Sequence, residues 1–437
     1  MPSMFRYLLN DVRGRPTTVA AELRGAGATF LTMAYILPVN AGILSAAMGA
    51  ESTPSIVACT ALAAGVCCVL MGLVANVPIA LASGMGLNAL VAFELANRAG
   101  SWQAAMGLVV LEGILILALV LLGLREAVLA AIPKSLKLAI GAGIGLFIAL
   151  IGLSNAAIVV QGVPAPPGGP LLAAGDFHQP ATAISLAGLV ITAVLMARRV
   201  KGALLLGIVA TTGIAALANQ VTWPTEWNWP SFSVALQPDL AGAMRWELIP
   251  LLFALMMVDF FDTLGTATAV AEEGDLMDEE GRIPGIRRLL AVDSVSASIG
   301  GLLGVSSVTC YIESAAGVAE GARTGLHSVF VGLMFLLAIV LAPLAAMIPP
   351  AATAPALILV GLLMLRPIAE LDFSQLDEAI PAFITLITIP TTYSIAHGIG
   401  YGFVSLVLIK LGTGRAGELS PLMYGVAAAF AAYFVVT

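Results

Sequence analysis

Residues 306–325 read SSVTCYIESAAGVAEGARTG, and this stretch decides how the rest of the chain is interpreted. It lies among apolar segments of membrane-span length, yet it places Glu313 where a lipid-facing helix would carry apolar side chains. Residues 308–312 are rich in strand-forming residues, whereas the small residues after Glu313 favour a helix. The pattern predicts a short strand that leads into half a helix, whose N-terminus points at a site within the membrane.

A second stretch, in the first half of the chain, has the same shape. Residues 76–93 read NVPIALASGMGLNALVAF, so that Pro78 and strand-forming residues precede two glycines and a helix containing Asn88. Gly84 and Gly86 have two interpretations of equal weight. A glycine lets a backbone approach a ligand closely, and it also serves as a packing notch between membrane helices. The two stretches together predict a pair of broken spans.

The composition requires a membrane as the main solvent. Of 437 residues 59% are hydrophobic and 10% are charged, which leaves too few polar groups to cover a soluble globule of this size. Apolar runs of about 20 residues recur along the chain, and each is long enough to cross about 30 Å of hydrocarbon as a helix. The net charge of −7, without a large basic cluster, argues against nucleic acid as a partner.

We predict an all-α polytopic protein with fourteen spans. Their expected positions are 28–47, 55–76, 79–96, 102–124, 134–153, 181–197, 202–220, 247–270, 288–303, 306–320, 327–348, 351–366, 379–394 and 396–411. The apolar run 420–436 stays unassigned, because it either crosses, lies at the interface or packs on the bundle. Basic residues such as Arg125 follow the even-numbered spans, on the side of the arginine-bearing N-terminus. The positive-inside rule therefore places the N-terminus in the cytoplasm and the chain in the inner (cytoplasmic) cell membrane.

The two halves of the chain resemble each other. Ile132-Pro133 before one glycine-containing span matches Ile348-Pro349 before another, and seven spans separate the two copies. An odd number of spans reverses the orientation, so we predict two inverted seven-span repeats with a substrate site near the midplane. The loop on the outer side carries tryptophans that we interpret as interfacial anchors: Trp223, Trp227 and Trp229.

Acidic residues are hidden within the apolar sequence of spans 8 to 10, namely Asp259, Asp262, Asp293 and Glu313. Each would cost about 2.5–3.5 kcal/mol at mid-bilayer if it faced lipid, so each must face protein or water. Asp259 and Asp262 share one helix face, and Thr263 extends that polar stripe. A carboxylate there accepts a hydrogen bond from a ring N–H or holds a proton, and the structural alternative is a polar pair that is satisfied between helices. Glu112, in span 4, is a further buried acid without an assigned role.

No cofactor, metal or catalytic group is expected. The four cysteines lie inside apolar runs without metal-ligand spacing, and three scattered histidines form neither a metal site nor a catalytic triad. A nucleotide-binding loop of the G-x-x-x-x-G-K-S/T type does not occur, so ATP is excluded as the energy source on this chain and an ion gradient is favoured. These absences argue for a transporter rather than an enzyme.

At these residues the chain resembles the azaguanine-type purine permeases, a branch of the nucleobase/ascorbate transporter superfamily. The resemblance runs nearly end to end and is carried by TTVAAELRGAGATFLTMAYILPVN (17–40), MGLNA (85–89), IPKSLKLAIGAGIGLFIALIGL (132–153), VDFFDTLGT (258–266), YIESAAGVAEGARTGL (311–326) and PTTYSIAHGIGYGF (390–403). It implies a core domain of spans 1–4 and 8–11 and a gate domain of spans 5–7 and 12–14, with short strands and half-helices in spans 3 and 10. The matching boundaries are a cytoplasmic lead (1–27), core (28–124 and 247–349), gate (125–220 and 350–437) and an extracellular loop (221–246).

The resemblance also implies roles for single residues. Asp259 and Glu313 match the acids that bind the purine, and Asn88 matches a polar contact from span 3. The remaining expected substrate contacts are Phe260, Thr263, Ser314 and Gly86. Phe260 is expected to stack on the flat ring, with Phe261, Phe93 and Tyr35 as alternative stacking residues. The proton-coupling set is Asp259, Asp262, Asp293 and Glu313. The implied activity is proton symport of a purine nucleobase by an elevator-like movement of the core against the gate, in a lipid bilayer and in a possible homodimer.

The departures from the family pattern leave the substrate open. Ser83 stands where the family usually has Pro, and Leu90 and Val91, just after Asn88, stand where it has aromatic residues. Adenine, guanine and hypoxanthine remain alternatives. The competing interpretations are a transporter of the same fold for another heterocycle (xanthine, uracil or a urate-like ring) or for a small anion, and a channel or membrane enzyme. Glu313, in place of a positive residue, disfavours an anion.

Overall fold

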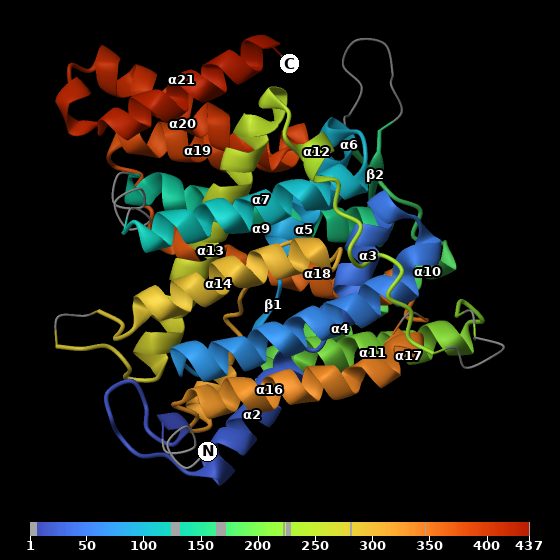
Figure 1. Cartoon of the computed structure of the whole chain (residues 1–437). Coiled ribbons are helices and arrows are strands. Elements are labelled where there is room, and N and C mark those ends of the chain that lie inside the picture. The colour runs from blue at the N-terminus through green and yellow to red at the C-terminus, as the bar shows by residue number, and fades with distance from the viewer. Residues whose placement is uncertain are drawn as a thin grey trace.

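The computed structural model describes residues 7–123, 132–162, 172–221, 223, 229–279, 282–345 and 347–436. Within these residues, nine helices are long and apolar enough to cross a bilayer, which confirms the prediction of a mostly helical, multi-pass membrane protein. In Figure 1 several long helices run roughly parallel to one another, among them α4 (Thr53–Leu70), α7 (Trp102–Leu121), α14 (Ile286–Leu302) and α16 (Gly325–Ala338). The longest, α13 (Ile249–Glu273), has 25 residues and is therefore about 37 Å long, more than the thickness of the hydrocarbon layer.

One group of elements, named here the half-helix bundle, contains both broken spans. Its members are α2 (Val19–Met33), α3 (Ile36–Met48), α4 (Thr53–Leu70), η2 (Met71–Ala75), β1 (Leu81–Ser83), α5 (Met85–Leu90), η3 (Val91–Leu95), α6 (Ala96–Ala99), α7 (Trp102–Leu121), α12 (Leu240–Ala243), α13, α14 (Ile286–Leu302), β4 (Val308–Cys310), α15 (Ser314–Ala319), α16 (Gly325–Ala338) and α17 (Ala342–Ala345). In this bundle α4 packs on α16, α7 on α14, and α2 on α15 and α16.

The other group, named the flanking bundle, consists of α9 (Lys134–Asn155), β2 (Val159–Gln161), β3 (Leu172–Ala174), α10 (Pro180–Ala197), α11 (Ala203–Leu217), α18 (Pro350–Met364), η6 (Arg366–Glu370), α19 (Leu376–Thr392), α20 (Ile395–Gly412), η7 (Ala416–Glu418) and α21 (Pro421–Val436). Its central pair is α9 and α18, each with a proline as its N-cap residue (Pro133 and Pro349), at the two positions that the repeat argument singled out. Helices α19, α20 and α21 lie together at one end of the molecule (Figure 1).

Several predicted spans differ in length from their helices. The span predicted at 202–220 is the shorter α11, of 15 residues, whereas α14 and α19, of 17 residues each, are close to the predicted 288–303 and 379–394. The first helix begins at Val19 rather than at residue 28, because Thr18 caps it by accepting a hydrogen bond from the N–H of Ala21. Its first turn also carries the buried Glu22, which accepts hydrogen bonds from the backbone of Arg323 and Thr324.

The unassigned run 420–436 forms α21, which packs along α20. The Phe434 ring stacks on His397 with 5.6 Å between ring centroids, and Phe430 stacks on Phe403 at 6.2 Å. Of the outer tryptophans, Trp223 and Trp229 are exposed, as an interfacial anchor requires. Trp227 and Arg125 lie outside the described residues.

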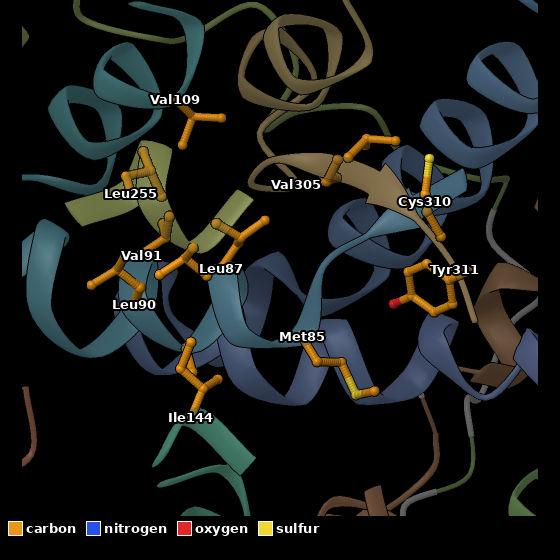
Figure 2. Close-up of a cluster of buried hydrophobic side chains, with 14 of the residues drawn as sticks. Met85, Leu87, Leu90, Val91, Val109, Ile144, Leu255, Val305, Cys310 and Tyr311 are labelled. Carbon is orange, nitrogen blue, oxygen red and sulfur yellow. The ribbon is translucent and has the colours of Figure 1, made fainter. Parts of the chain in front are cut away.

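Close helix packing depends on small residues, as is usual in membranes. A Cβ added at Gly332 of α16 would lie 2.6 Å from the carbonyl oxygen of Gly65 on α4, and one at Gly325 would lie 2.1 Å from that of Gly72. Neither position tolerates a side chain without separating the helices. Figure 2 shows the apolar cluster around α5, in which Leu87 and Leu90 lie among residues of neighbouring helices such as Leu255.

The segment before α2 is tied to the half-helix bundle by polar contacts. The Asn76 side chain donates hydrogen bonds to the carbonyl oxygens of Tyr7 and Asn10. Arg15 forms an ion pair with Asp275, in the turn after α13, at 2.7 Å. This hydrogen-bonded arginine, together with the charge of Arg13, holds the pKa of the exposed Asp275 carboxyl below its usual range.

Candidate substrate-binding site

Two broken spans cross at the centre of the half-helix bundle. Strands β1 and β4 pair in antiparallel fashion, with Ser83 opposite Val308 and Leu81 opposite Cys310. Each strand leads into a short helix, α5 or α15, so the predicted strands and half-helices of spans 3 and 10 are present. Because the strands are antiparallel, the half-helices leave the crossing in opposite directions, and their N-terminal ends approach each other.

Tight backbone packing holds the crossing together. The N–H of Gly84 donates to the Ser307 carbonyl at 3.0 Å, and the N–H of Tyr311 donates to the Ala80 carbonyl at 2.9 Å. A Cβ at Gly84 would lie 2.7 Å from the Thr309 methyl group, so this position requires glycine. The Tyr311 hydroxyl donates a hydrogen bond back to the carbonyl of Ser83.

Asn88 places an amide group in the first turns of half-helix α5. The side chain is fully buried, and its oxygen accepts a hydrogen bond of 2.6 Å from the Ser83 hydroxyl, which also contacts the Val305 carbonyl. Among the described residues, the Asn88 amide nitrogen has no hydrogen-bond partner. A buried donor without a partner is costly, so it is a candidate contact for a ligand acceptor.

Glu313 stands directly before half-helix α15 and is held by a residue from the first span. The hydroxyl of the fully buried Tyr35, at the junction of α2 and α3, donates a hydrogen bond of 2.6 Å to the Glu313 carboxylate. Glu313 itself is only partly buried. A charge-assisted hydrogen bond of this length fixes the orientation of the carboxylate and leaves its other oxygen for a further donor.

Asp262 on α13 faces the same region. Its carboxyl group is partly buried and lies within electrostatic range of both Glu313 and Asp293. Three acids from α13, α14 and the start of α15 are therefore gathered near the crossing. A ligand with N–H donors would meet carboxylate acceptors from three elements here.

Asp293 is part of a buried network that joins three elements. The Thr263 hydroxyl donates to the Asp293 carboxylate at 2.7 Å and lies 2.9 Å from the Thr309 hydroxyl of β4. The Cys310 thiol lies 3.5 Å from the other carboxylate oxygen. All four side chains are buried, so Thr263 links α13 to α14 and to the strand crossing.

The other predicted site residues have different surroundings. Asp259 and Phe260 are both fully buried within α13, one turn before Thr263. The Ser314 hydroxyl donates to the Tyr311 carbonyl at 2.6 Å and accepts from the Ala80 N–H at 2.9 Å, so it ties the two broken spans together. A Cβ at Gly86 would lie 2.7 Å from Ile144 of α9, which favours the packing interpretation of this glycine.

Sequence reasoning overlooked several buried polar residues. Tyr35 was expected only as a stacking candidate, but it is the hydrogen-bond donor to Glu313. Two further acids inside apolar runs, Glu22 and Glu94, are also buried. Their position within hydrophobic sequence is the same signal that identified Asp293, and counting every such acid would have found them.

The fold and this crossing define a polytopic membrane protein with two paired half-helices at its centre. A model of the permease family matches residues 22–401. The chain belongs to this permease family, and it is a transporter rather than an enzyme.

Relatives at about 40% identity cover nearly the whole chain. The adenine permease AdeQ of Escherichia coli (strain K12) is 41% identical over 95% of this chain and 93% of its own length. The guanine/hypoxanthine permease PbuG of Bacillus subtilis (strain 168) is 39% identical over 96% of this chain and 97% of its own length. The putative permease MJ0326 of Methanocaldococcus jannaschii is 41% identical over 96% and 95%.

Solved structures of low identity share the fold. The transmembrane domain of the cyanobacterial bicarbonate transporter BicA superposes with a TM-score of 0.64 at 17% identity, covering 86% of this chain and 96% of that domain. The murine anion transporter Slc26a9, in its inward-facing state, gives a TM-score of 0.66 at 12% identity, covering 90% of this chain and 68% of that one. These similarities show the architecture alone.

Proposed function

We propose that this permease is a secondary transporter that imports a purine nucleobase together with protons. The observation that carries the proposal is the grouping of Glu313, Asp262 and the Asn88 amide nitrogen at the crossing of the two half-helices, where this nitrogen has no partner among the described residues. A purine offers ring and exocyclic N–H donors to carboxylates and ring-nitrogen or carbonyl acceptors to an amide donor. The names of the relatives, adenine permease and guanine/hypoxanthine permease, support the same class of substrate.

In this proposal each residue has a defined role. The Glu313 carboxylate, oriented by Tyr35, accepts N–H donors of the base, and the Asn88 amide donates to an acceptor on another edge. Asp259 contributes a further carboxylate from α13, with Phe260 against the ring, while Thr263, Ser314 and Gly86 shape the site. Hydrogen bonds to both kinds of edge would distinguish a purine from an apolar ring of equal size, because a missing partner leaves a buried polar group unpaired.

We base the proposed proton coupling on the several acidic side chains that lie close to one another near the strand crossing. Asp262 and Glu313 lie within electrostatic range of each other, and Asp293 lies within range of Asp262. Neutralising one of these groups lowers the cost of keeping the others charged, so proton binding and purine binding affect each other at this site. We assign Asp259, Asp262, Asp293 and Glu313 to this coupling.

We further propose that transport occurs by an elevator-type movement. The half-helix bundle would be the core (28–124 and 247–349) and the flanking bundle the gate (125–220 and 350–437), arranged as two inverted seven-span repeats. The packing is more extensive within each bundle than between the two, which supports this division. The excess of arginine and lysine at one side supports a cytoplasmic N-terminus in the inner membrane, and a homodimer is proposed on the resemblance alone.

An anion is the second candidate substrate, since the two solved transporters of this fold carry names for bicarbonate and anion transport. Their identity to this chain is only 17% and 12%. Glu313 at the start of half-helix α15 would repel an anion, because its charge opposes the positive end of the helix dipole. Another heterocycle, such as xanthine, uracil or a urate-like ring, keeps the same hydrogen-bond logic.

Thermal stabilisation of the purified protein by a panel of ligands tests the proposal. A ligand that binds the native state raises the melting temperature by mass action, so adenine, guanine or hypoxanthine is expected to stabilise the protein. The shift should be lost in Glu313→Gln. Stabilisation by bicarbonate or sulfate alone, or by none of the purines, would exclude the proposed substrate class while leaving the fold unchanged.

A further inference from the structure

Glu94 belongs to the half-helix bundle, but its carboxylate is bound by the flanking bundle. It lies on η3, the continuation of half-helix α5, and is only 5% exposed. The Ser394 hydroxyl donates a hydrogen bond to one carboxylate oxygen, and the backbone N–H of Ala396 donates to the other at 3.3 Å. His397 Nδ1 lies 3.8 Å from the first oxygen. The carboxylate therefore satisfies the N-terminus of α20, where the helix dipole favours negative charge.

Glu320 makes a similar contact from the other broken span. It is the residue that ends half-helix α15, and its carboxylate forms an ion pair with Lys201. Lys201 directly precedes Gly202, the N-cap residue of α11 in the flanking bundle. This pair is more exposed than the first, with 57% of the Lys201 side chain and 35% of the Glu320 side chain accessible.

The two contacts correspond to each other across the two halves of the chain. Each glutamate follows a half-helix, and each partner stands at the N-terminal end of a flanking helix, α20 or α11, from the opposite half. Because α5 and α15 leave the strand crossing in opposite directions, Glu94 and Glu320 lie toward opposite ends of the bundle. By the predicted orientation Glu94 faces the outside and Glu320 the cytoplasm.

We propose that Glu94 and Glu320 are a pair of latches, positioning residues that hold the half-helix bundle against the flanking bundle at both faces. The inference rests on the proposed elevator movement. A displacement of one rigid bundle along the membrane normal carries both glutamates in the same direction, so both contacts break together. The buried outer latch, with two hydrogen bonds to a carboxylate, stabilises this arrangement more than the exposed inner pair.

Other exposed ion pairs provide matched controls, because both of their partners move with the same bundle. Arg15 and Asp275 join two segments of the half-helix bundle side at 2.7 Å, and Lys134 and Glu370 join α9 to η6 within the flanking bundle at 2.7 Å. The acids of these pairs, Asp275 at 77% and Glu370 at 60% exposed, are more accessible than Glu320 at 35%. Breaking either one is expected to leave the relative position of the two bundles unchanged.

A cavity of about 400 Å³ beside the outer latch provides the place for a measurement. It is lined from the half-helix bundle by Asn97 and Arg98 and from the flanking bundle by Thr392 and Tyr393. Asn97 and Thr392 are exposed, so spin labels on cysteines at these two positions report the distance between the bundles. The four native cysteines are buried and react poorly with the label.

The experiment measures the distance between these two spin labels by pulsed electron paramagnetic resonance, with the full-length protein in lipid nanodiscs. Glu94→Gln should change the ratio of the populations at two label distances by about ten-fold. Glu320→Gln should change the same ratio by up to about five-fold. The decisive expectation is that Glu320→Gln, at the opposite face, changes the outer distance while Asp275→Asn and Glu370→Gln do not. Raising the salt from about 0.1 M to about 1 M should mimic Glu320→Gln, since exposed charges are screened.

An outer distance that responds to Glu94→Gln but not to Glu320→Gln or to salt would overturn the pairing. If Glu94→Gln does not fold, Ser394→Ala removes one donor to the carboxylate and retains its charge, with the same expectation. A protein that shows the paired response but binds no purine in the thermal assay would disprove the proposed substrate, and the latches would stand. Purine binding without the paired response would disprove the latches alone.

Discussion

The contact between Tyr35 and Glu313 orients a single acid inside the membrane, as the proposed ligand recognition requires. An isolated carboxylate would be free to rotate or would take up a proton, because hydrocarbon and buried protein disfavour its charge. The 2.6 Å hydrogen bond from a fully buried phenol fixes one oxygen and supports the charged form. The second oxygen can then meet a ligand N–H in a defined direction.

Replacing Tyr35 with Phe is expected to weaken purine uptake without unfolding the protein. The ring keeps its packing, but the carboxylate loses a hydrogen bond worth about 1.5–3 kcal/mol. We expect KM to rise roughly ten-fold in reconstituted vesicles. Tyr424→Phe is the control, because its hydroxyl donates at 2.8 Å to the Ala416 carbonyl, away from the site. Equal KM values for Tyr35→Phe and the unmodified protein would contradict the role given to this tyrosine.

Two buried asparagines should respond differently to truncation. The Asn88 amide nitrogen is unpaired among the described residues, so Asn88→Ala is expected to reduce purine affinity about ten-fold with a small change in melting temperature. Asn40 instead donates to the Thr60 hydroxyl at 2.9 Å and to the Val305 carbonyl at 3.4 Å. Asn40→Ala should therefore lower the melting temperature and leave affinity unchanged. Binding titrations and thermal melts of both variants test this expectation. A lower melting temperature with unchanged affinity in Asn88→Ala would show that Asn88 does not contact the ligand.

At the scale of elements, the position of half-helix α5 against α9 depends on the absence of a side chain. A Cβ at Gly86 would approach Ile144 to 2.7 Å, closer than real carbon atoms come. The backbone of half-helix α5 at Gly86 therefore contacts the Ile144 side chain of α9 directly. In this arrangement a change in the packing of α9 is transmitted to the residues that follow Gly86, including Asn88.

Gly86→Ala is expected to destabilise the protein by about 1–3 kcal/mol through overpacking. The clash involves a methyl group of Ile144, so Ile144→Ala in the same chain should restore part of the loss. A double-mutant cycle of melting temperatures measures this coupling. Gly141→Ala serves as the control. Gly141 lies on α9, as Ile144 does, and a carbon added there has open space around it. Additive losses for Gly86→Ala and Ile144→Ala would show that the two positions do not interact.

At the scale of the whole molecule, coupling requires that an acid away from the ligand respond to protons. Asp293 joins α13, α14 and β4 through Thr263 and Thr309 and lies within range of the Asp262 charge. A proton on Asp293 would change both the hydrogen-bond network and the electrostatic field at Asp262. Its buried position between three elements suits a role in coupling rather than direct contact.

Asp293→Asn is expected to separate coupling from binding. The amide oxygen still accepts from Thr263, but the group no longer titrates, so an inside-alkaline pH gradient should cease to accelerate uptake into vesicles. Exchange of adenine across the membrane without a gradient should persist, because the proposed ligand contacts remain. Asp176→Asn, in an exposed loop, is the control. Gradient-driven uptake that survives in Asp293→Asn would assign coupling to another acid.

The sequence by itself determined the class of protein, the broken spans and the acids. Apolar runs of span length can be read locally, because the bilayer sets one length and one polarity for every crossing segment. The change from strand to helix at residues 81–90 and 308–319 could also be predicted, because glycine and strand-forming residues influence the conformation of the backbone next to them. Asp293 and Glu313 could also be recognised locally, because a charged residue within an apolar run would be costly if it faced lipid.

Only the tertiary structure decided which of these groups meet. Tyr35 and Glu313 are 278 positions apart, and Glu94 and Ser394 are 300 apart, so no local pattern could pair them. The pattern of polar residues in the sequence likewise could not show that the Ser314 hydroxyl accepts a hydrogen bond from the backbone N–H of Ala80, or that Gly86 contacts α9. Spacing along a chain determines which helix face a residue occupies, whereas the neighbour of that face depends on how all the helices pack.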